Sequence, residues 1–317
     1  MSPVITQPSN KTIVESIQEL KERKNALIMA HYYQVPEIQE VADMVGDSLQ
    51  MAQYAAQSKA DILVVAGVCF MAETAKILNP TRTVLLPDLQ AGCSLADSCP
   101  PDQFKAFIDE HPGSPVVSYI NCSAEIKAMS DVICTSSNAV KIITSIQSKK
   151  PIIFAPDVNL GKYLMHETGR ELLLWNGSCL VHENFSIDKI LDLHQKHPEA
   201  KFIAHPESQP HILRIASYIG STRGMIDFVK QYPGREFIVA TEAGILHQMH
   251  KEVPHKTLIP APAFEDNTCA CSECPYMKMN TLEKLRDCLL HEHPQIHVNE
   301  ATRQGAERSL KRMLELS

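Results

Sequence analysis

The sequence predicts an α/β fold of three homologous three-layer αβα domains with parallel sheets around a pseudo-threefold axis. The first observation behind this prediction is an internal repeat whose period is that of a whole domain. The second is that apolar runs of strand length alternate with helical patterns of about ten or more residues, which is typical of parallel α/β layers. The third is that these runs are apolar without alternation, as in strands buried on both faces.

Four sets of equivalent positions define the repeat. A polar residue ends the first apolar run of each copy, at His31, Tyr119 and His205. A hydroxyl residue follows 17 positions later, at Ser48, Ser136 and Thr222. A second apolar run reaches Ala66, Ala155 and Ala240, and a loop after the third run carries Cys93, Cys179 and Cys274. These registers predict domains at residues 12–98, 99–192 and 193–280, with C-terminal helices at 281–317 packing back on the body.

The first copy predicts the following order of elements. An amphipathic helix over 12–24 precedes a buried strand over 25–31. Pro36 opens a helix over 36–45, where its missing N–H costs nothing. Ser48 then stands at the start of a helix over 48–60. A strand over 61–68, a helix over 69–80 and a strand over 83–88 complete the copy.

The second and third copies repeat this pattern. The second copy predicts strands at 115–120, 151–157 and 171–176, a short apolar run at 132–135, and helices at 123–131, 136–150 and 158–169. The third copy predicts strands at 201–206, 235–241 and 257–262 and helices at 211–220, 221–233 and 244–253. Residues 281–291 and 301–317 have helical periodicity.

Composition narrows the class of protein. The 317 residues are 44% hydrophobic and carry a net charge of −7 with both signs interspersed, so we expect no nucleic-acid partner. The N-terminus lacks the pattern of a secretory signal, and the longest apolar stretch is shorter than the ~20 residues that span a bilayer. We therefore expect a soluble, cytoplasmic protein without a membrane partner. Ten cysteines in a reducing compartment favour metal or reactive chemistry over disulfides.

The repeat itself predicts a site. Ligands of parallel sheets bind beyond the carboxyl ends of the strands, where the three cysteine loops all lie. If these edges face one axis, three thiolates meet and form a soft-metal site. Zinc would need a fourth ligand, whereas an iron–sulfur cluster held by three cysteines leaves one iron with an open coordination position. The spacing of the cysteines in the sequence does not distinguish between these two cofactors. The three hydroxyl residues at expected helix starts add an anion-binding character suited to carboxylates or a phosphate.

Several stretches also resemble one enzyme family, quinolinate synthase. They are AHYYQVPEIQEVADMVGDSLQMA, PDLQAGCSLADSCP, VSYIN, TSSNA, WNGSCLVHENF, AHPES, GSTRGM and CSECPYMKMN, and together they cover almost the whole chain. The resemblance implies condensation of iminosuccinate with dihydroxyacetone phosphate to quinolinate, with loss of phosphate and two waters, in NAD biosynthesis. It also implies an oxygen-sensitive 4Fe-4S cluster, three α/β domains about a pseudo-threefold axis, and supply of the imine by an aspartate oxidase or dehydrogenase.

The resemblance assigns roles to individual residues. It implies that Cys93, Cys179 and Cys274 bind the cluster and that the remaining iron faces the substrate. It implies acid/base candidates in Tyr33 and Glu207, with His31 and His205 as further catalytic candidates. The implied substrate contacts are His31, Ser48, Tyr119, Asn121, Ser136, His205, Glu207 and Thr222.

Two further points stay open from the sequence. Many family members carry a Cys-x-x-Cys-x-x-Cys run around the third ligand, whereas this chain has Cys269, Cys271 and Cys274, so a redox role of the first two is undecided. A zinc-thiolate hydrolase and a non-catalytic iron–sulfur redox sensor are the rival functions for the same cysteines.

Overall fold

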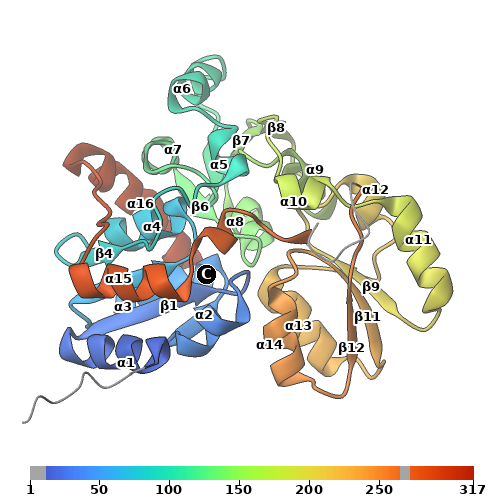
Figure 1. Ribbon diagram of the computed structural model, residues 1–317. Helices are drawn as coiled ribbons and strands as arrows, with labels where there is room; N and C mark the ends of the chain where they lie inside the picture. Colours follow the sequence, from blue (N-terminus) through green and yellow to red (C-terminus); the bar gives the residue numbers. More distant parts are fainter. Residues whose placement is uncertain (1–11, 265–271) are drawn as a thin grey trace, which may run out of the picture.

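The computed structural model describes residues 12–264 and 272–317, and in these residues it contains three four-stranded parallel sheets. The strand orders are β2-β1-β3-β4, β6-β5-β7-β8 and β10-β9-β11-β12, which is the same order three times. Figure 1 shows the three sheets as separate layers with helices around them, the first in blue, the second in green and the third in orange. The predicted fold class of three αβα domains is confirmed.

We call each sheet with its helices a unit. The first unit contains α1 (Ile13–Arg23), β1 (Ala26–His31), α2 (Pro36–Val41), β2 (Met44–Gly46), α3 (Ser48–Gln57), β3 (Ile62–Ala66), α4 (Cys69–Leu78), β4 (Thr83–Leu85) and α5 (Ser94–Asp97). The second contains α6 (Pro101–Asp109), β5 (Val116–Tyr119), α7 (Ala124–Met129), β6 (Val132–Cys134), α8 (Ala139–Ser145), β7 (Ile152–Ala155), α9 (Val158–Thr168), β8 (Leu172–Leu174) and α10 (Leu180–Glu183).

The third unit follows the same sequence of elements. It contains α11 (Ile187–Lys196), β9 (Lys201–Ala204), α12 (Pro210–Leu213), β10 (Tyr218–Ile219), α13 (Thr222–Gln231), β11 (Glu236–Ala240), α14 (Ile245–Glu252), β12 (Thr257–Pro260) and the 3₁₀ turn η2 (Met277–Met279). Helices α15 (Leu282–His291) and α16 (Glu300–Leu316) end the chain. The domain boundaries after residues 98, 192 and 280 stay predictions; α11 runs across the second of them.

Two helices are shorter than predicted, because a short edge strand takes up the second part of each predicted range. The helix expected over 36–45 ends at Val41, and β2 pairs with β1 in the register Met29↔Met44. The helix expected over 211–220 ends at Leu213, and β10 pairs with β9 through Tyr218↔Ile203. In both units the partly buried apolar residues after the helix pair with the first strand, and this pairing overrides their helical spacing.

Ser48 and Thr222 lie at helix starts as expected and Ser136 does not, and none of the three is the N-cap residue. Asp47 caps α3 and Ser221 caps α13 through side-chain bonds to backbone N–H groups, so Ser48 and Thr222 are the first helical residues. Ser136 lies before Asn138, the N-cap of α8, and α8 is shorter than the helix expected over 136–150. The capping box of Asp47 with Gln50 nevertheless fixes the start of α3 firmly.

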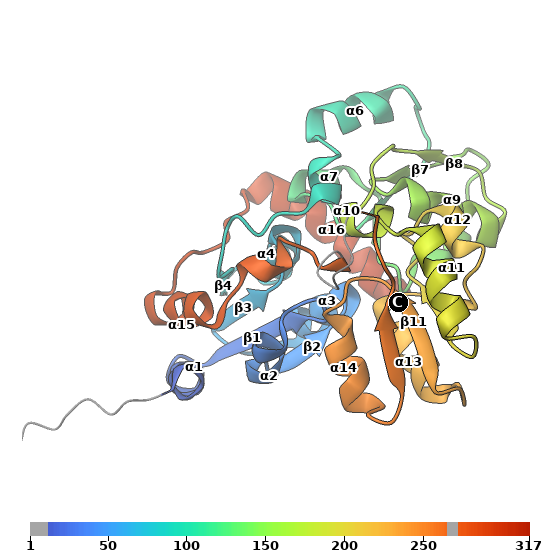
Figure 2. The same cartoon turned by 45° about the vertical axis from the view of Figure 1, so that its right-hand side comes forward.

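The units share buried cores. The five residues of β3 are all buried, and one apolar cluster continues from the first unit through α4 and Ile120 into the second. Helix α15 packs beside α1 on the first unit, and α16 packs on α7 and β6 of the second, as both views show (Figures 1 and 2). These contacts agree with C-terminal helices that pack back on the body.

Candidate active site

One cavity lies where the three units meet, and it is lined from the carboxyl ends of strands in all three sheets. The space between its walls, counted together with its open mouth, is about 720 Å³. The lining includes every residue proposed from the sequence: His31, Tyr33, Ser48, Cys93, Tyr119, Asn121, Ser136, Cys179, His205, Glu207, Thr222 and Cys274. The repeat therefore brings residues scattered along the chain to one place, while their individual roles stay predictions.

Short helices after the last strand of the first two units present the cysteines. Cys93 is the N-cap residue of α5 and Cys179 that of α10, and neither uses its side chain to cap the helix. Cys274 precedes η2, the corresponding turn of the third unit. Burial raises the pKa of Cys93 to about 12, and burial also raises the pKa values of Cys179 and Cys274. These three thiols would ionise only beside a strong positive charge, which is what a metal ion supplies.

Glu207 stands at the centre of the polar contacts in the cavity. The Tyr119 hydroxyl donates to its Oε1 at 2.5 Å, and His182 Nδ1 lies 3.1 Å from its Oε2. Burial alone would raise the pKa of Glu207, but the neighbouring His182 and His205 and the hydrogen bonds from His182 and Tyr119 outweigh burial and lower the pKa to about 2. The carboxylate is thus held ionised in a buried position.

His31 and His205 are both kept neutral. Burial lowers the pKa of each to about 3, although the charge of Glu207 works in the opposite direction. His31 Nδ1 accepts from the Tyr33 N–H at 3.2 Å, and the His205 ring lies 4.7 Å from the His182 ring. Neutral imidazoles can both accept and donate hydrogen bonds to a substrate without adding charge.

Tyr33 is connected to Glu207 through two side chains. Its hydroxyl lies 2.7 Å from Thr241 Oγ1, and Thr241 Oγ1 lies 2.9 Å from His182 Nε2. Burial first, and then the charge of Glu207, raises the pKa of Tyr33 well above its usual value. The phenol therefore keeps its proton and can donate it.

The amide and hydroxyl residues form another side of the cavity. The Asn121 side-chain oxygen is buried without a hydrogen-bond partner in the described part of the chain, so an acceptor is available for a ligand. Asp47 and Ser137, neighbours of Ser48 and Ser136, bond at 2.6 Å between their side chains. This bond fixes the two serines relative to each other across the boundary of two units.

Sequence reasoning missed four charged or titratable residues of the cavity lining, Asp47, His182, Glu242 and Tyr276, of which His182 and Glu242 contact the proposed site residues most directly. His182 lies three residues after Cys179, one helical turn along α10, and its Nδ1 is 3.2 Å from the Cys179 sulfur. Glu242 follows the second apolar run by two residues, the position that Asp157 occupies in the second unit. Inspecting the residues after Ala155 and Ala240 would have shown two buried carboxyl groups at equivalent positions.

A metal could use more than the three cysteines. Cys179, His182 and Glu207 offer ligand atoms that all lie within 4.8 Å of one another. Cys269 and Cys271 lie outside the described residues, so their predicted redox role stays open. Cys99, Cys122, Cys134 and Cys288 are buried apart from the cavity lining, as expected of small apolar residues.

Fold and cavity together define an α/β protein with a thiol-lined central site. The sequence model of the family described as Quinolinate synthetase A protein matches residues 15–315. Curated relatives named quinolinate synthase include one from Nostoc sp., 59% identical over 98% of this chain and 96% of its own length, and one from Trichodesmium erythraeum, 58% identical over 96% and 94%. Another from Nostoc punctiforme is 60% identical over 95% and 93%. The chain belongs to the quinolinate synthase family of NAD biosynthesis, and it is an enzyme.

None of the helices in residues 12–264 and 272–317 combines the length and the apolar character needed to cross a bilayer.

Proposed function

We propose that this chain condenses iminosuccinate with dihydroxyacetone phosphate to quinolinate, releasing phosphate and two waters. The observation that carries the proposal is the cavity in which all twelve residues expected from the family resemblance gather. The family membership over residues 15–315 supports the same reaction. A reducing cytoplasm would suit the free thiols of the site.

The proposed cofactor is one 4Fe-4S cluster on Cys93, Cys179 and Cys274. The donor set fits: three partly buried cysteines line one cavity, one from each unit, and the desolvation of their thiols keeps them protonated unless a cation compensates their charge. When bound, such a cluster supplies an open iron that acts as a Lewis acid on a hydroxyl or carboxylate of the substrate.

The proposed substrate contacts are polar and neutral. The hydroxyls of Ser48, Ser136 and Thr222 lie at or near the starts of α3, α8 and α13, where free backbone N–H groups attract anions. They suit the phosphate or the carboxylates of the two substrates. Asn121 offers its unpaired oxygen, and neutral His31 and His205 offer further hydrogen bonds.

The proposed proton transfers use Glu207 and Tyr33. Glu207 is the base that takes a carbon-bound proton when the triose phosphate isomerises, because its carboxylate is ionised and buried. Tyr33 is the acid that donates a proton during ring closure, since its phenol lines the cavity and its hydroxyl lies 2.7 Å from Thr241 Oγ1, from which it can be reprotonated. Thr241 and His182 connect the two groups through hydrogen bonds.

Protein purified without oxygen tests this proposal directly. We expect about four iron and four sulfide per chain, a brown colour, and quinolinate formed from the two substrates. Cys179→Ser should lose the colour and the product together. Brown wild-type protein that makes no quinolinate would instead support a redox sensor.

A zinc hydrolase is the second candidate, and one observation favours it. Cys179, His182 and Glu207 form a compact set of sulfur, nitrogen and oxygen ligand atoms of the kind that zinc accepts. A colourless preparation with one zinc per chain would support this rival.

The proposed supplier of the imine, an aspartate oxidase or dehydrogenase, can be tested by coupling either enzyme to the assay in place of chemically made iminosuccinate.

A further inference from the structure

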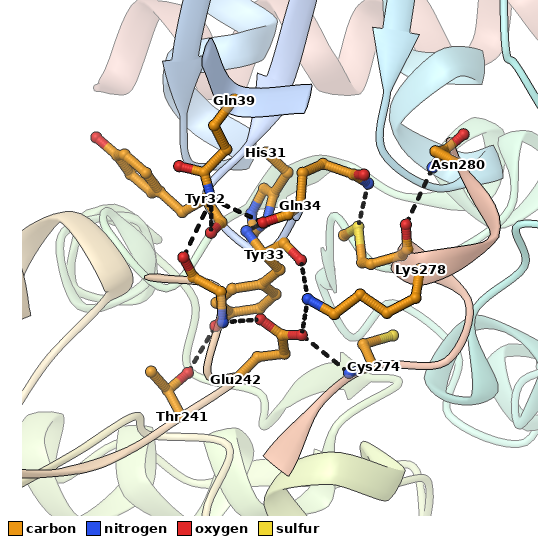
Figure 3. A network of polar contacts seen from close by, with 12 residues as sticks. His31, Tyr32, Tyr33, Gln34, Gln39, Thr241, Glu242, Cys274, Lys278 and Asn280 are labelled. Carbon is orange, nitrogen blue, oxygen red and sulfur yellow. Dashed lines mark hydrogen bonds and ion pairs between the residues drawn. The ribbon is translucent and has the colours of Figure 1, made fainter. Parts of the chain in front are cut away.

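Glu242 is a buried carboxylate that the proposed reaction does not use. It follows β11 in the third unit, and its side chain is 1% exposed. Its Oε1 accepts from the Cys274 N–H at 3.0 Å and from Lys278 Nζ at 2.9 Å, while its Oε2 accepts from the Gly244 N–H at 2.7 Å. Figure 3 shows the carboxylate between the ammonium of Lys278 and the backbone of Cys274.

Lys278 extends these contacts to the first unit. Its Nζ donates to the Tyr33 carbonyl at 2.8 Å as well as to Glu242 (Figure 3). One ammonium therefore joins the turn that carries a proposed acid to the carboxylate that holds a proposed metal ligand. We call residues 272–280 the Cys274 segment and residues 31–34 the Tyr33 turn.

The opposite side of the Tyr33 turn is held by Gln39. Its Nε2 donates to the carbonyls of Tyr32 at 3.0 Å, Gln34 at 2.7 Å and Gly244 at 3.1 Å. Gly244 approaches this turn so closely that an added Cβ would lie 2.8 Å from the carbonyl carbon and oxygen of Tyr33. At Gly244 the first and third units are thus in contact backbone to backbone, with no space there for a side chain.

The energetics indicate that this ion pair sets geometry rather than stability. Burying two charges costs several kcal/mol in desolvation, and apolar residues of similar volume often give equal or greater stability. Charged hydrogen bonds with several partners do, however, fix positions. Here the three partners of Glu242 lie in the Cys274 segment and beside the Tyr33 turn.

We propose that Glu242 and Lys278 are positioning residues that hold the Cys274 segment and the Tyr33 turn in one fixed arrangement across two units. This inference rests on the proposed function, in which Cys274 binds the cluster and Tyr33 donates a proton. Neither Glu242 nor Lys278 takes part in a chemical step. Their loss changes how the reacting groups are presented.

The test compares Lys278→Met with a matched control. Lys251→Met breaks the Lys251–Glu40 ion pair of 2.9 Å, which also joins the third unit to the first but is about half exposed on both sides. Two measurements are made on each protein. Amide hydrogen exchange of the Cys274 segment and the Tyr33 turn is followed in metal-free protein, and kcat and KM are measured in the reconstituted enzyme.

We expect exchange at the Cys274 amide to rise about 10-fold or more in Lys278→Met, since a buried charged hydrogen bond to its acceptor is lost. We expect kcat to fall about 10-fold or more with KM within about 3-fold, because positioning and not substrate affinity is lost. Lys278→Arg should recover most of both values. Lys251→Met should stay within about 2-fold of the wild type.

Unchanged exchange in Lys278→Met, or raised exchange with a wild-type kcat, would overturn the inference. A wild-type enzyme that makes no quinolinate would overturn the proposed function instead, and the exchange data would still decide whether the pair holds the segment. If Lys278→Met does not fold, Gly244→Ala displaces the Tyr33 turn without removing a charge. It should lower kcat with iron retained, and a wild-type kcat in that variant would contradict the inference.

Discussion

Glu207 shows how a buried carboxylate can stay ionised without a lysine or arginine beside it. Its two oxygens contact the Tyr119 hydroxyl and His182, and these contacts offset the cost of burial. The donors come from the second unit, whereas Glu207 follows β9 in the third. The contacts that keep the buried Glu207 carboxylate ionised therefore form only when these two units are packed together.

Glu207→Gln tests the base. We expect the iron content and visible spectrum of the wild type, because Glu207 is not one of the proposed ligands, and a loss of activity of about 100-fold or more, which is typical for removal of a general base. Glu236→Gln, at a half-exposed ion pair with His197 in the same unit, is the control and should keep full activity. Wild-type turnover in Glu207→Gln would remove this residue from the mechanism.

The two buried histidines predict acid sensitivity. Their folded pKa values of about 3 lie below the ordinary 6.5, so between these limits the unfolded chain binds more protons than the folded chain. Stability must therefore fall as the pH falls from 6.5, by up to about 1.4 kcal/mol per pH unit for each histidine. Urea unfolding of metal-free protein between pH 7.5 and 5 measures this slope.

A variant identifies the source of that slope. His205→Gln should reduce the pH dependence by about half, because one of the two histidines is gone. His166→Gln, whose side chain is 85% exposed, should leave it unchanged. Equal slopes in His205→Gln and the wild type would mean that other groups cause the acid sensitivity.

At the level of elements, α16 completes the second unit from outside the repeat. Gly305 lies against α7 so closely that an added Cβ would be 2.8 Å from Ala128 Cβ, and Ser309 donates to the Lys127 carbonyl at 2.7 Å. Leu310 and Met313 are fully buried on the same helix. The last helix is therefore part of the core that supports Tyr119 and Asn121.

Leu310→Ala should destabilise the protein by about 2–5 kcal/mol, because it leaves a cavity between α16 and the second unit. Lys311→Ala is the neighbouring control, since it removes only an exposed ion pair with Glu307 worth less than about 1 kcal/mol. Chemical denaturation of both variants measures the difference. Similar stabilities would show that α16 contributes little to the folded core.

Short elements were the hardest to predict. The long strands and helices of all three copies could be predicted from apolar runs and helical spacing, because these patterns extend over many residues. Strand β6 was visible as an isolated run between polar residues, whereas the apolar residues of β2 and β10 continued a helical pattern. Their strand conformation comes from pairing with β1 and β9, which local sequence does not contain.

For the whole molecule, the candidate site was predictable where the repeat gave a register. Cys93, Cys179 and Cys274 were identified because they occupy equivalent positions, and all three line the cavity. His182 and Glu242 were not, since their importance depends on partners far along the chain: Glu207 in the third unit for His182, and Lys278, which also contacts the Tyr33 carbonyl of the first unit, for Glu242. Contacts between units cannot be predicted from the sequence of one unit alone.

Because each unit supplies one thiol, the three cysteines should be equally necessary. We expect Cys93→Ser, Cys179→Ser and Cys274→Ser each to lose nearly all bound iron, since two remaining thiolates do not replace a three-cysteine site. Cys288→Ser is the control, because Cys288 is a buried residue of α15 that packs into another part of the first unit's core. Iron and sulfide analysis after anaerobic reconstitution measures the result. Full iron in any one of the three variants would show that its unit does not hold the cluster. Full iron in Cys93→Ser or Cys274→Ser with none in Cys179→Ser would point instead to a site built from the neighbouring Cys179, His182 and Glu207 atoms.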